Sequence, residues 1–416
     1  MIYDLIIIGA GAAGLFAAAN APAGFKTLVL EKTGSPGRKL LLTGSGQCNL
    51  TNNEPIKAFL ARYGVNGKCL RSVLFPFSNL ALMDYFEQNG LPLKVREDGK
   101  VFPVSMKSTD VLNLLLDLSR KSNVTFCYQA SVTEIAQQNK RDGCRFIIQT
   151  AGEQYYTKNV LVATGGESYP QTGSDGSFFA CLEHMGLSLV PRKPALVPVL
   201  VKDYPYSNLP GLTFPNCKVE LSHSRGSVLP TGKNPVTIEG SLLLTHKGFS
   251  GPPVLEISRY VTQGNKLNIN YLPTRTPEEL RLELIQAAAG DPRQVSTILE
   301  TITALPRSFI EQICHRSSIG KNIKASRLTG SEMGIITELL IADSFEISGT
   351  GGFAAAMTTA GGISLDEINL KTMEAKRYPG LYIAGEVLDV DGDTGGYNLQ
   401  FAFSSAMLAM KSSHKT

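Results

Sequence analysis

The feature that most constrains how this chain can fold is a glycine-rich turn between two apolar segments at its N-terminus. Residues 5–8 are Leu-Ile-Ile-Ile and lead directly into the turn, residues 9–14, after which an apolar helical run begins. A second apolar segment, residues 27–30, ends at Glu31, about 20 residues beyond the glycines. This order of strand, glycine turn, helix, strand and acid predicts a dinucleotide-binding βαβ unit.

Each residue of this pattern has a separate expected role. Gly9 permits the tight turn, Gly11 has no side chain to block a pyrophosphate, and Gly14 lets the helix pack closely on the strand. Ala13 lies in the first helical turn, whose free N–H groups and positive dipole end favour phosphate groups. Glu31 is expected to accept hydrogen bonds from the ribose 2′-hydroxyl. A glycine-rich turn without a ligand is the alternative, and it leaves the terminal acid unexplained.

Length and composition set the broad class. The 416 residues, 43% hydrophobic and 18% charged, suit a soluble globular protein of two domains or one domain with an insertion. A net charge of +4 permits anionic partners without requiring them. The seven cysteines lack CxxC spacing, which argues against a disulfide framework, a zinc site and a dithiol redox pair. No long apolar run or basic leader is found, so we expect a cytoplasmic protein without a membrane span.

The segment that follows the βαβ unit, residues 32–52, is glycine-rich and carries three cations. It stands where the diphosphate and ring system of a dinucleotide must be covered, so Arg38 and Lys39 are expected at the pyrophosphate and Asn49 at a ring edge. The other residues assigned to the site from this segment are Lys32, Thr43 and Gly46. A surface loop with no ligand is the alternative.

The middle of the chain is expected to alternate between helices and strands. Residues 55–120 are predicted to be mostly helical, with a hairpin at 93–103 that turns at Asp98-Gly99. The strands predicted next are 124–128, 144–150, 154–157 and 159–163. The last one runs into Thr164, Gly165 and Gly166, as expected where the carboxyl edge of a sheet meets a cofactor. Val132 is assigned to the same site.

An inserted domain is predicted at residues 192–356. Four β-rich segments joined by Pro and Gly turns predict an antiparallel barrel or sandwich within about 192–275; they are 195–201, 217–221, 236–245 and 266–272. Four helices are expected in the following part, about 276–345, at 276–289, 291–303, 306–315 and 329–342. The dinucleotide-binding domain is therefore predicted to be discontinuous, formed by residues 1–191 and 357–416.

The C-terminal region is expected to complete the cofactor site. Residues 381–384 form a short buried-type strand, and an acidic, glycine-rich segment leads from it into a helix at 401–410. Two glycines at the start of a helix expose N–H groups that would favour negative charge on a flavin's pyrimidine edge. The residues assigned here are Gly385, Glu386, Asp389, Gly396, Asn398 and Leu399. The acids lack the ligand pattern of a calcium loop, and no metal site is predicted.

Several motifs in this order resemble one family over nearly the whole chain. They are GAGAAGL, GRKLLLTGSGQCNLTN, VLVATGGESYPQTGSDG, LLLTHKGFSGPPVLEIS, TTAGGI and TMEAKRYPGLYIAGEVLDVDGDTGGYNLQ. The sequence resembles the BaiN/RdsA-like NAD(P)/FAD-dependent oxidoreductases, although Gln47 stands where many relatives have arginine. The resemblance implies an α/β fold with a Rossmann-like FAD-binding domain split by an insert. It also implies reductase chemistry, on uracil in ribosomal RNA in some members and on steroid-type double bonds in others.

A flavin reductase needs an acid that protonates the carbon next to the one that accepts the hydride. The candidates are Cys48 in the cofactor loop and His246 in the insert, with a packing residue and a turn-capping residue as the respective alternatives. No second GxGxxG follows a strand, so NAD(P)H is expected to dock transiently at the flavin. Cys48 lacks a partner cysteine, which argues against disulfide reductase chemistry; a monooxygenase stays open.

The substrate class is left open by the sequence. The alternatives are ribosomal RNA, a small hydrophobic enone, and a protein that binds FAD without catalysis. Residues 312–331 contain four cations and no acid, which indicates either a solvated surface or phosphate contacts; they are Arg316, Lys321, Lys324 and Arg327. Lys247, next to His246, would also contact phosphates if the substrate is RNA. No stable protein partner is predicted.

Overall fold

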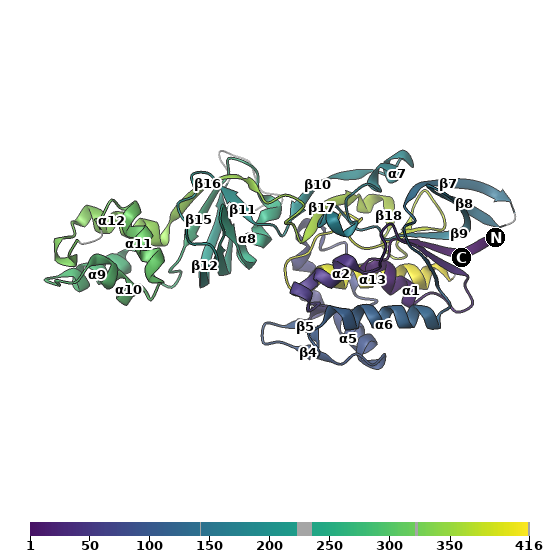
Figure 1. Cartoon of the computed structure of the whole chain (residues 1–416), viewed down its shortest axis with the longest axis horizontal. Helices are drawn as coiled ribbons and strands as arrows, with labels where there is room; N and C mark the ends of the chain where they lie inside the picture. Colours follow the sequence, from purple (N-terminus) through teal and green to yellow (C-terminus); the bar gives the residue numbers. More distant parts are fainter. Residues whose placement is uncertain (142, 223–234, 321–322, 415–416) are drawn as a thin grey trace. The chain divides into compact units, whose positions relative to one another are not determined.

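The computed structural model describes residues 1–141, 143–222, 235–320 and 323–414, and it separates into two units (Figure 1). The first unit consists of Met1–Ala195 with Phe353–Thr416, and the second of Leu196–Gly352. The first unit is therefore discontinuous in sequence, with the second inserted into it. The sequence placed the two boundaries after residues 191 and 356, close to those of the structure.

The first unit is built on a nine-stranded sheet with a parallel centre. Its main path runs in the order β18-β19-β20-β9-β1-β2-β6, and β7 and β8 extend it antiparallel from β9. Ile8 of β1 lies level with Leu30 of β2 and Val162 of β9, and Val162 lies level with Ile383 of β20. The strands are β1 Ile2–Ile8, β2 Thr27–Leu30, β6 Thr125–Cys127, β7 Val132–Arg141, β8 Cys144–Thr150, β9 Gln154–Val162, β18 Ile368–Asn369, β19 Glu374–Ala375 and β20 Leu381–Ile383. The carboxyl ends of four parallel strands therefore meet at one edge, where open α/β sheets bind their ligands.

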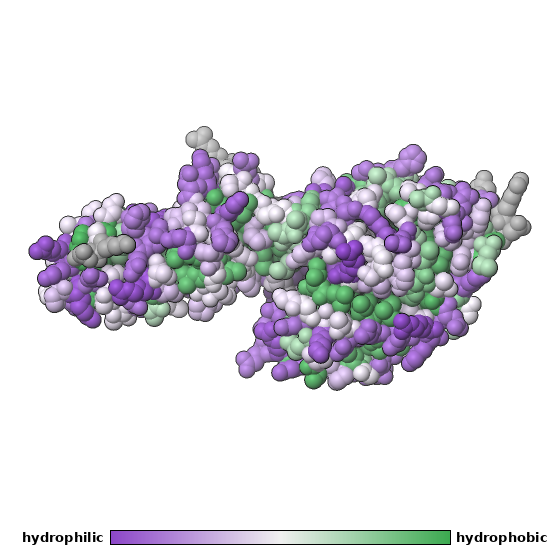
Figure 2. All heavy atoms as spheres, viewed as in Figure 1, coloured by the Kyte–Doolittle hydropathy of each residue, from purple (hydrophilic) through white to green (hydrophobic). Residues whose placement is uncertain are grey.

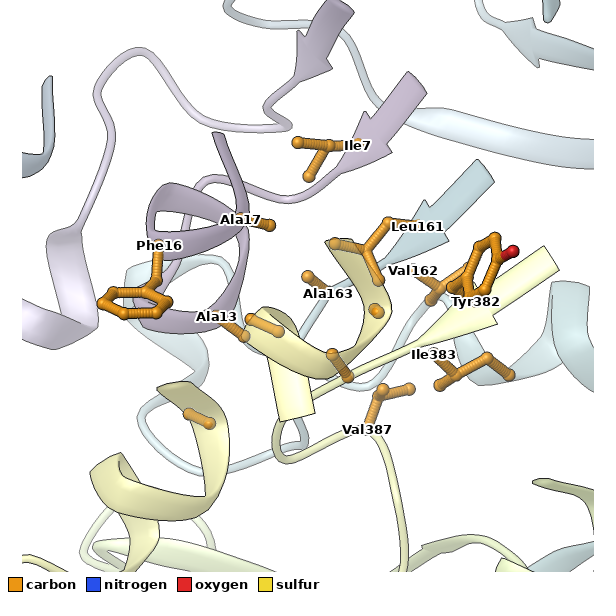
Figure 3. Packing of buried hydrophobic residues seen from close by; sticks show 14 of the residues in the cluster. Ile7, Ala13, Phe16, Ala17, Leu161, Val162, Ala163, Tyr382, Ile383 and Val387 are labelled. Atoms are coloured by element: carbon orange, nitrogen blue, oxygen red, sulfur yellow. The ribbon is translucent and has the colours of Figure 1, made fainter. Parts of the chain in front are cut away.

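Small side chains let the first helix lie close to this sheet. In α1, Ala12–Ala19, Ala13 and Ala17 are buried, and Figure 3 shows them near Ala163, which follows β9. The apolar run of β1 is buried as well, as its lack of polar residues predicts. Helices α6, Ser108–Lys121, and α13, Tyr397–Ser413, pack against α1. The predicted βαβ unit is therefore present, and α1 begins at the carboxyl edge of the sheet.

The remaining elements of the first unit surround this core. The predicted hairpin is confirmed, because β4 and β5 pair antiparallel, and β3 extends them to a three-stranded sheet. Strands β10 and β17, which precede and follow the second unit in sequence, pair with each other. The bounds are α2 Arg38–Leu42, η1 Thr43–Gly46, β3 Thr51–Asn52, α3 Ile56–Phe59, η2 Leu60–Asn66, α4 Arg71–Leu74, α5 Asn79–Gln88, β4 Leu93–Val95, β5 Lys100–Pro103, η3 Pro170–Thr172, α7 Phe179–His184, β10 Leu189–Ala195, β17 Thr358–Ile363 and η6 Leu365–Glu367.

The second unit contains a closed barrel and a group of helices. The barrel strands follow one another in the order β11-β14-β13-β12-β15-β16. Thr276 and Thr329 form capping boxes that begin two of the helices. The bounds are β11 Val199–Val201, β12 Thr213–Ser222, β13 Val236–Leu244, β14 Gly248–Ser250, α8 Pro252–Ile257, η4 Ser258–Tyr260, β15 Lys266–Asn270, α9 Pro277–Ala288, α10 Val295–Thr303, α11 Arg307–Arg316, η5 Ala325–Arg327, α12 Gly330–Ile341 and β16 Asp343–Thr350.

Four details differ from the sequence prediction. The segments 154–157 and 159–163 form one continuous strand, β9, and the polar strand β7 was not predicted. The barrel is not confined to residues 192–275, because its closing strand β16 follows the helices and pairs with β11 and β15. Gly349 and Thr350, predicted as part of a turn, belong to β16. Strand β16 pairs with strands on the other side of the helices in sequence, and β7 has few apolar residues, so local pattern reveals neither strand.

A buried ionic cluster connects the helices of the second unit to its barrel. The Asp343 carboxylate, on β16, is fully buried and accepts hydrogen bonds from the Arg316 guanidinium at 2.7 and 2.8 Å. It also accepts from the hydroxyls of Tyr206 at 2.5 Å and Tyr271 at 3.2 Å. The Arg316 guanidinium lies over the rings of Tyr206 and Phe345. This full set of partners offsets the cost of removing both charges from water.

Candidate cofactor site

A cavity lies at the carboxyl edge of the parallel strands in the first unit. It contains about 1390 Å³ of empty space, part of it open to solvent, so it can hold a ligand as large as a dinucleotide. Sixteen of the residues predicted to bind the cofactor line it: Gly9, Gly11, Ala13, Glu31, Lys32, Arg38, Lys39, Thr43, Val132, Thr164, Gly165, Gly166, Gly385, Glu386, Asn398 and Leu399. The structure therefore brings together segments from both ends of the chain.

The glycine turn leaves space for a ligand at one position. A Cβ added to Gly11 would meet no atom within 4 Å, and Gly11 lines the cavity, so the space next to it belongs to the cavity. Gly11 is also the N-cap of α1 and makes no side-chain cap, which leaves the N–H groups of the first turn available. Backbone N–H groups at a helix N-terminus bind phosphate well.

Gly14 does not line the cavity but is required for packing. A Cβ there would lie 1.9 Å from the carbonyl oxygen of Gly9, so only glycine lets α1 pack on the turn. Gly396 also lies outside the lining, and its Cβ would lie 2.5 Å from the carbonyl oxygen of Thr51. Gly46 does not line the cavity either. The steric role of Gly14 is the one expected from the sequence, whereas for Gly396 the structure shows a steric role in addition to its position near the cofactor segment.

Glu31 stands at the end of β2 with a carboxylate that is held in place. One oxygen accepts a hydrogen bond from the backbone N–H of Ala10 at 2.7 Å. The other accepts from the N–H and the hydroxyl of Thr33 at 2.8 and 2.7 Å. A carboxylate can accept about four hydrogen bonds, so one position remains for a ligand hydroxyl. This geometry fits the predicted ribose contact.

The three cations of residues 32–52 have different environments. The Lys32 ammonium pairs with Asp175 at 2.5 Å, and both side chains are more than a third exposed. The Lys39 ammonium pairs with Glu386 at 2.6 Å and donates to the hydroxyl of Ser168. Arg38 is exposed and makes no ion pair or hydrogen bond with any residue that the structure describes. The structure therefore differs from the prediction for Lys39, whose charge is already matched by a carboxylate.

Asp389 and Asn398 are occupied with contacts inside the protein. Asp389 does not line the cavity; its carboxylate accepts hydrogen bonds from Asn66 at 3.2 Å and from the N–H of Gly361 at 3.1 Å. Burial raises the pKa of this carboxyl above its ordinary value. Asn398 lines the cavity, but its amide donates to and accepts from the backbone of Gly392. Both side chains thus hold the segment before α13 in its fold.

Cys48 and Asn49 lie in the loop behind the cavity lining. The Cys48 side chain is fully buried, and burial raises the pKa of its thiol to about 12. Neither residue lines the cavity. The structure favours the packing alternative for Cys48, because a buried thiol cannot reach a substrate. The Asn49 Oδ1 atom is buried and has no hydrogen-bond partner in the described part of the chain. An unsatisfied acceptor of this kind calls for an additional donor, such as a bound ligand or water.

His246, the other acid candidate, lies in the second unit. It is exposed in the turn between β13 and β14, next to Thr245, which donates its N–H and hydroxyl to the carbonyl of Gly248 at 2.9 Å. The turn is therefore closed by Thr245 rather than by the histidine. A substrate-facing role for His246 stays a prediction.

Fewer cations of residues 312–331, in the second unit, are free to contact phosphate than a count from the sequence suggests. Arg316 is committed to the buried Asp343, which rules it out as a free phosphate contact. Lys324 and Arg327 are exposed, whereas Lys321 lies outside the described residues. Figure 2 shows hydrophilic side chains over much of the visible surface of helices α9 to α12. Of the two alternatives for this stretch, neither a solvated surface nor a phosphate contact describes Arg316, which is paired with Asp343.

Sequence reasoning missed several residues of the cavity wall. Residues 172–179 line the cavity, and Gly173 packs on Thr33 so closely that an added Cβ would lie 2.6 Å from its methyl group. Ser168 and Thr359 do not line the cavity themselves, but they hydrogen-bond to Glu386, which does. A signal for Thr359 existed in the motif TTAGGI, but nothing local shows that this strand contacts a residue of the cavity wall. Among the described residues no group of three metal-ligating side chains exists, and no described helix is long and apolar enough to cross a membrane.

Comparison with known proteins gives matches over the whole chain. The family model described as "HI0933-like protein Rossmann domain" matches residues 3–412. The ribosomal RNA dihydrouridine synthase of Escherichia coli (strain K12) is 32% identical over 424 aligned residues, which cover 99% of each chain. The 3-dehydro-bile acid delta(4,6)-reductase of Clostridium scindens is also 32% identical, over 97% of each chain.

Solved structures share the fold at low sequence identity. The 3-ketosteroid-delta4-(5alpha)-dehydrogenase from Rhodococcus jostii RHA1 has a TM-score of 0.53 at 17% identity, covering 100% of this chain and 97% of that one. A flavocytochrome c3 fumarate reductase has a TM-score of 0.50 at 13% identity, covering 100% of this chain and 78% of that one. These likenesses agree with the fold described above, a Rossmann-type domain with an inserted unit.

Proposed function

Since the chain belongs to the HI0933-like family, as its motifs predicted, we propose that it is an FAD-dependent oxidoreductase that reduces an activated carbon–carbon double bond. The observation that carries the proposal is the cavity at the carboxyl edge of the sheet. Its wall combines the open space at Gly11, the fixed carboxylate of Glu31 and the Gly385–Glu386 segment. Two phosphates, a ribose and a ring system each find a suitable group in this wall.

The residues of the first unit fit FAD in two ways. Gly11 and the N–H groups of α1 suit the diphosphate, and the exposed Arg38, which has no ion pair with any described residue, adds a positive charge to the same cavity. Glu31 retains an acceptor position for a ribose hydroxyl. Bound FAD would supply the hydride at N5 and draw its electrons from a transiently docked NAD(P)H.

Protonation of the product is assigned to a group outside the cavity wall. Cys48 is the weaker candidate for this role, because its side chain is fully buried and does not line the cavity. His246 is exposed in the turn between β13 and β14, and we propose it as the acid. Its turn also carries the exposed Lys247, which would contact phosphate in an RNA substrate.

Uracil in ribosomal RNA is the substrate that we propose, with a steroid-like enone as the second candidate. Two of the relatives at 32% identity are named ribosomal RNA dihydrouridine synthase. Residues 196–275 hold eight Lys or Arg and four Asp or Glu, and Arg275 among them is paired with Glu283. The remaining excess of cations favours an anionic substrate. The exposed cations include Lys202, Lys247 and Lys266. The bile acid reductase, equally identical to this chain, supports the second candidate. A ribosomal RNA substrate would place the protein in the cytoplasm.

Stopped-flow spectroscopy of the flavin tests both parts of the proposal. Apoprotein titrated with FAD should bind one equivalent, and NADPH or NADH should bleach the bound flavin under anaerobic conditions. Unmodified ribosomal RNA should then reoxidise it, and mass spectrometry should detect dihydrouridine in the RNA. Reoxidation by a steroid enone alone would select the second candidate. A protein that binds no flavin would refute the proposal as a whole.

A further inference from the structure

Two adjacent cations at the cavity wall differ in what they contact. Lys39 donates from its ammonium to Glu386 Oε2 at 2.6 Å and to the hydroxyl of Ser168, and the side chains of Lys39 and Glu386 are each 20% exposed. Arg38 precedes Lys39 on the same helix and lines the same cavity, but it is exposed and unpaired in the described part of the chain. Arg38 and Lys39 are neighbouring cations in the sequence, but only Lys39 is paired with a carboxylate in the structure.

Glu386 is held by three separate chain segments. Its Oε1 atom accepts hydrogen bonds from the Ser168 hydroxyl at 2.7 Å and from the backbone N–H of Thr359 at 2.9 Å. The Thr359 hydroxyl in turn accepts from the N–H groups of Glu167 at 2.8 Å and Ser168 at 3.1 Å. With Lys39 on Oε2, the carboxylate receives three hydrogen bonds and one neutralising charge. These contacts hold the Glu386 carboxylate in one position in the cavity wall.

Gly166 shows how tightly this cluster is packed. A Cβ on Gly166 would lie 2.9 Å from Glu386 Oε1 and would overlap the side chain of Thr359. Because only glycine fits, Glu386 cannot swing toward residues 165–166 if its ammonium partner is removed. The carboxylate would stay in the cavity wall as an uncompensated negative charge.

On these contacts, and on the proposed FAD site, we propose that Lys39 is a positioning residue that acts through Glu386, whereas Arg38 contacts the cofactor diphosphate. Lys39 cancels the charge of Glu386 and fixes the carboxylate, so that an anionic cofactor enters a wall that is locally neutral. The diphosphate carries two negative charges, and like charges in a partly buried site repel one another strongly. Removing Lys39 would therefore weaken binding by exposing the cofactor to Glu386, not by removing a phosphate ligand.

A double-mutant cycle on FAD affinity separates the two roles. The dissociation constant of apoprotein for FAD is measured by flavin fluorescence for wild type, Lys39→Met, Glu386→Gln and the double variant. Lys39→Met should raise Kd about tenfold, which corresponds to about 1.4 kcal/mol. In the Glu386→Gln background the same change should raise Kd by less than about threefold, because no carboxylate is left to neutralise.

Arg38→Met serves as the matched control on the neighbouring residue. It should raise Kd about tenfold in both the wild-type and the Glu386→Gln background, and its FAD affinity should depend less on salt than that of wild type. Lys39→Arg, which conserves the charge, should lie closer to wild type than to Lys39→Met.

Other results would overturn the inference. If Lys39→Met weakens FAD binding equally with Glu and with Gln at position 386, then Lys39 contacts the diphosphate directly. An unchanged Kd in Lys39→Met would exclude both roles. Should Lys39→Met not fold, Ser168→Ala removes one bond to Glu386 without a change in charge and should raise Kd about threefold; no change there would refute the positioning role. A wild-type protein without FAD binding would instead refute the proposed function.

Discussion

The two glycines of the N-terminal turn should respond to substitution in opposite ways. At Gly11 the backbone is extended, with φ −80° and ψ −168°, which any residue adopts, and an added Cβ would meet no protein atom within 4 Å. At Gly14 a Cβ would lie 1.9 Å from the Gly9 carbonyl oxygen, so α1 would have to move away from the turn. We therefore expect Gly11→Val to affect the ligand and Gly14→Ala to affect the fold.

The magnitudes follow from these distances. Gly11→Val adds three carbons to the cavity, where the diphosphate of FAD needs close approach to the backbone, so FAD affinity should fall by at least about 100-fold, or about 2.7 kcal/mol. The apoprotein should unfold at the wild-type temperature or slightly above it, because losing a glycine reduces the entropy of the unfolded chain. Gly14→Ala forces an overlap in a packed interior, which typically costs about 1–3 kcal/mol.

The assay compares unfolding and binding in the same two variants. Differential scanning calorimetry of the apoproteins should show a lowered Tm for Gly14→Ala only, and FAD titration should show lost affinity for Gly11→Val. If Gly11→Val binds FAD as tightly as wild type, the glycine turn is not the diphosphate site. If its apoprotein loses as much stability as Gly14→Ala, the space beside Gly11 is not the open cavity inferred from the structure.

Three further substitutions test the clusters described above. Arg316→Met leaves the fully buried Asp343 carboxylate without its cation, which should cost about 3–5 kcal/mol and lower the Tm of the second unit by on the order of 10 °C in calorimetry, with FAD affinity unchanged. Cys48→Ala should keep the rate of substrate-dependent flavin reoxidation within about threefold, and a loss of about a hundredfold or more would show that the buried thiol is the acid after all. Lys32→Met removes an exposed pair with Asp175 and should change the free energy of unfolding by less than about 1 kcal/mol in urea titrations; a larger loss would mean that the pair is not screened by solvent.

Features with a strong local pattern were predictable from the sequence. The apolar run of residues 5–8 has no polar position, as required of a strand buried on both faces, and all four side chains are buried. The glycine spacing and the acid after β2 set the position of the cavity, because a βαβ unit places all of them at one edge of a sheet. Both inferences rest on residues that lie close together in the chain, so one sequence is enough to make them.

Two strands were harder to predict, for different reasons. Strand β7 has the sequence VTEIAQQNKR, in which polar residues outnumber apolar ones, and it is recognised only through its antiparallel pairing with the neighbouring strand β8. Strand β16 alternates buried and exposed residues, but it follows four helices. Its partners β11 and β15 precede those helices in the chain. Pairing across such distances is decided by the tertiary fold and not by local propensity.

The roles of charged residues are also hard to predict from local sequence, because whether a cation can bind a ligand depends on whether a carboxylate already pairs with it. Lys39 and Arg38 have the same sequence context, yet the partner of Lys39 is Glu386, 347 positions along the chain. Arg316 was counted within a basic stretch, yet its guanidinium forms an ion pair with Asp343. In both cases a carboxylate far away in sequence removes the cation from the set available to an anionic ligand. A count of cations in a segment therefore gives an upper bound on its phosphate contacts, and the ion pairs must be subtracted before binding is inferred. Applied to the cavity of the first unit, this subtraction leaves Arg38 for the diphosphate, which is why its substitution is the decisive control.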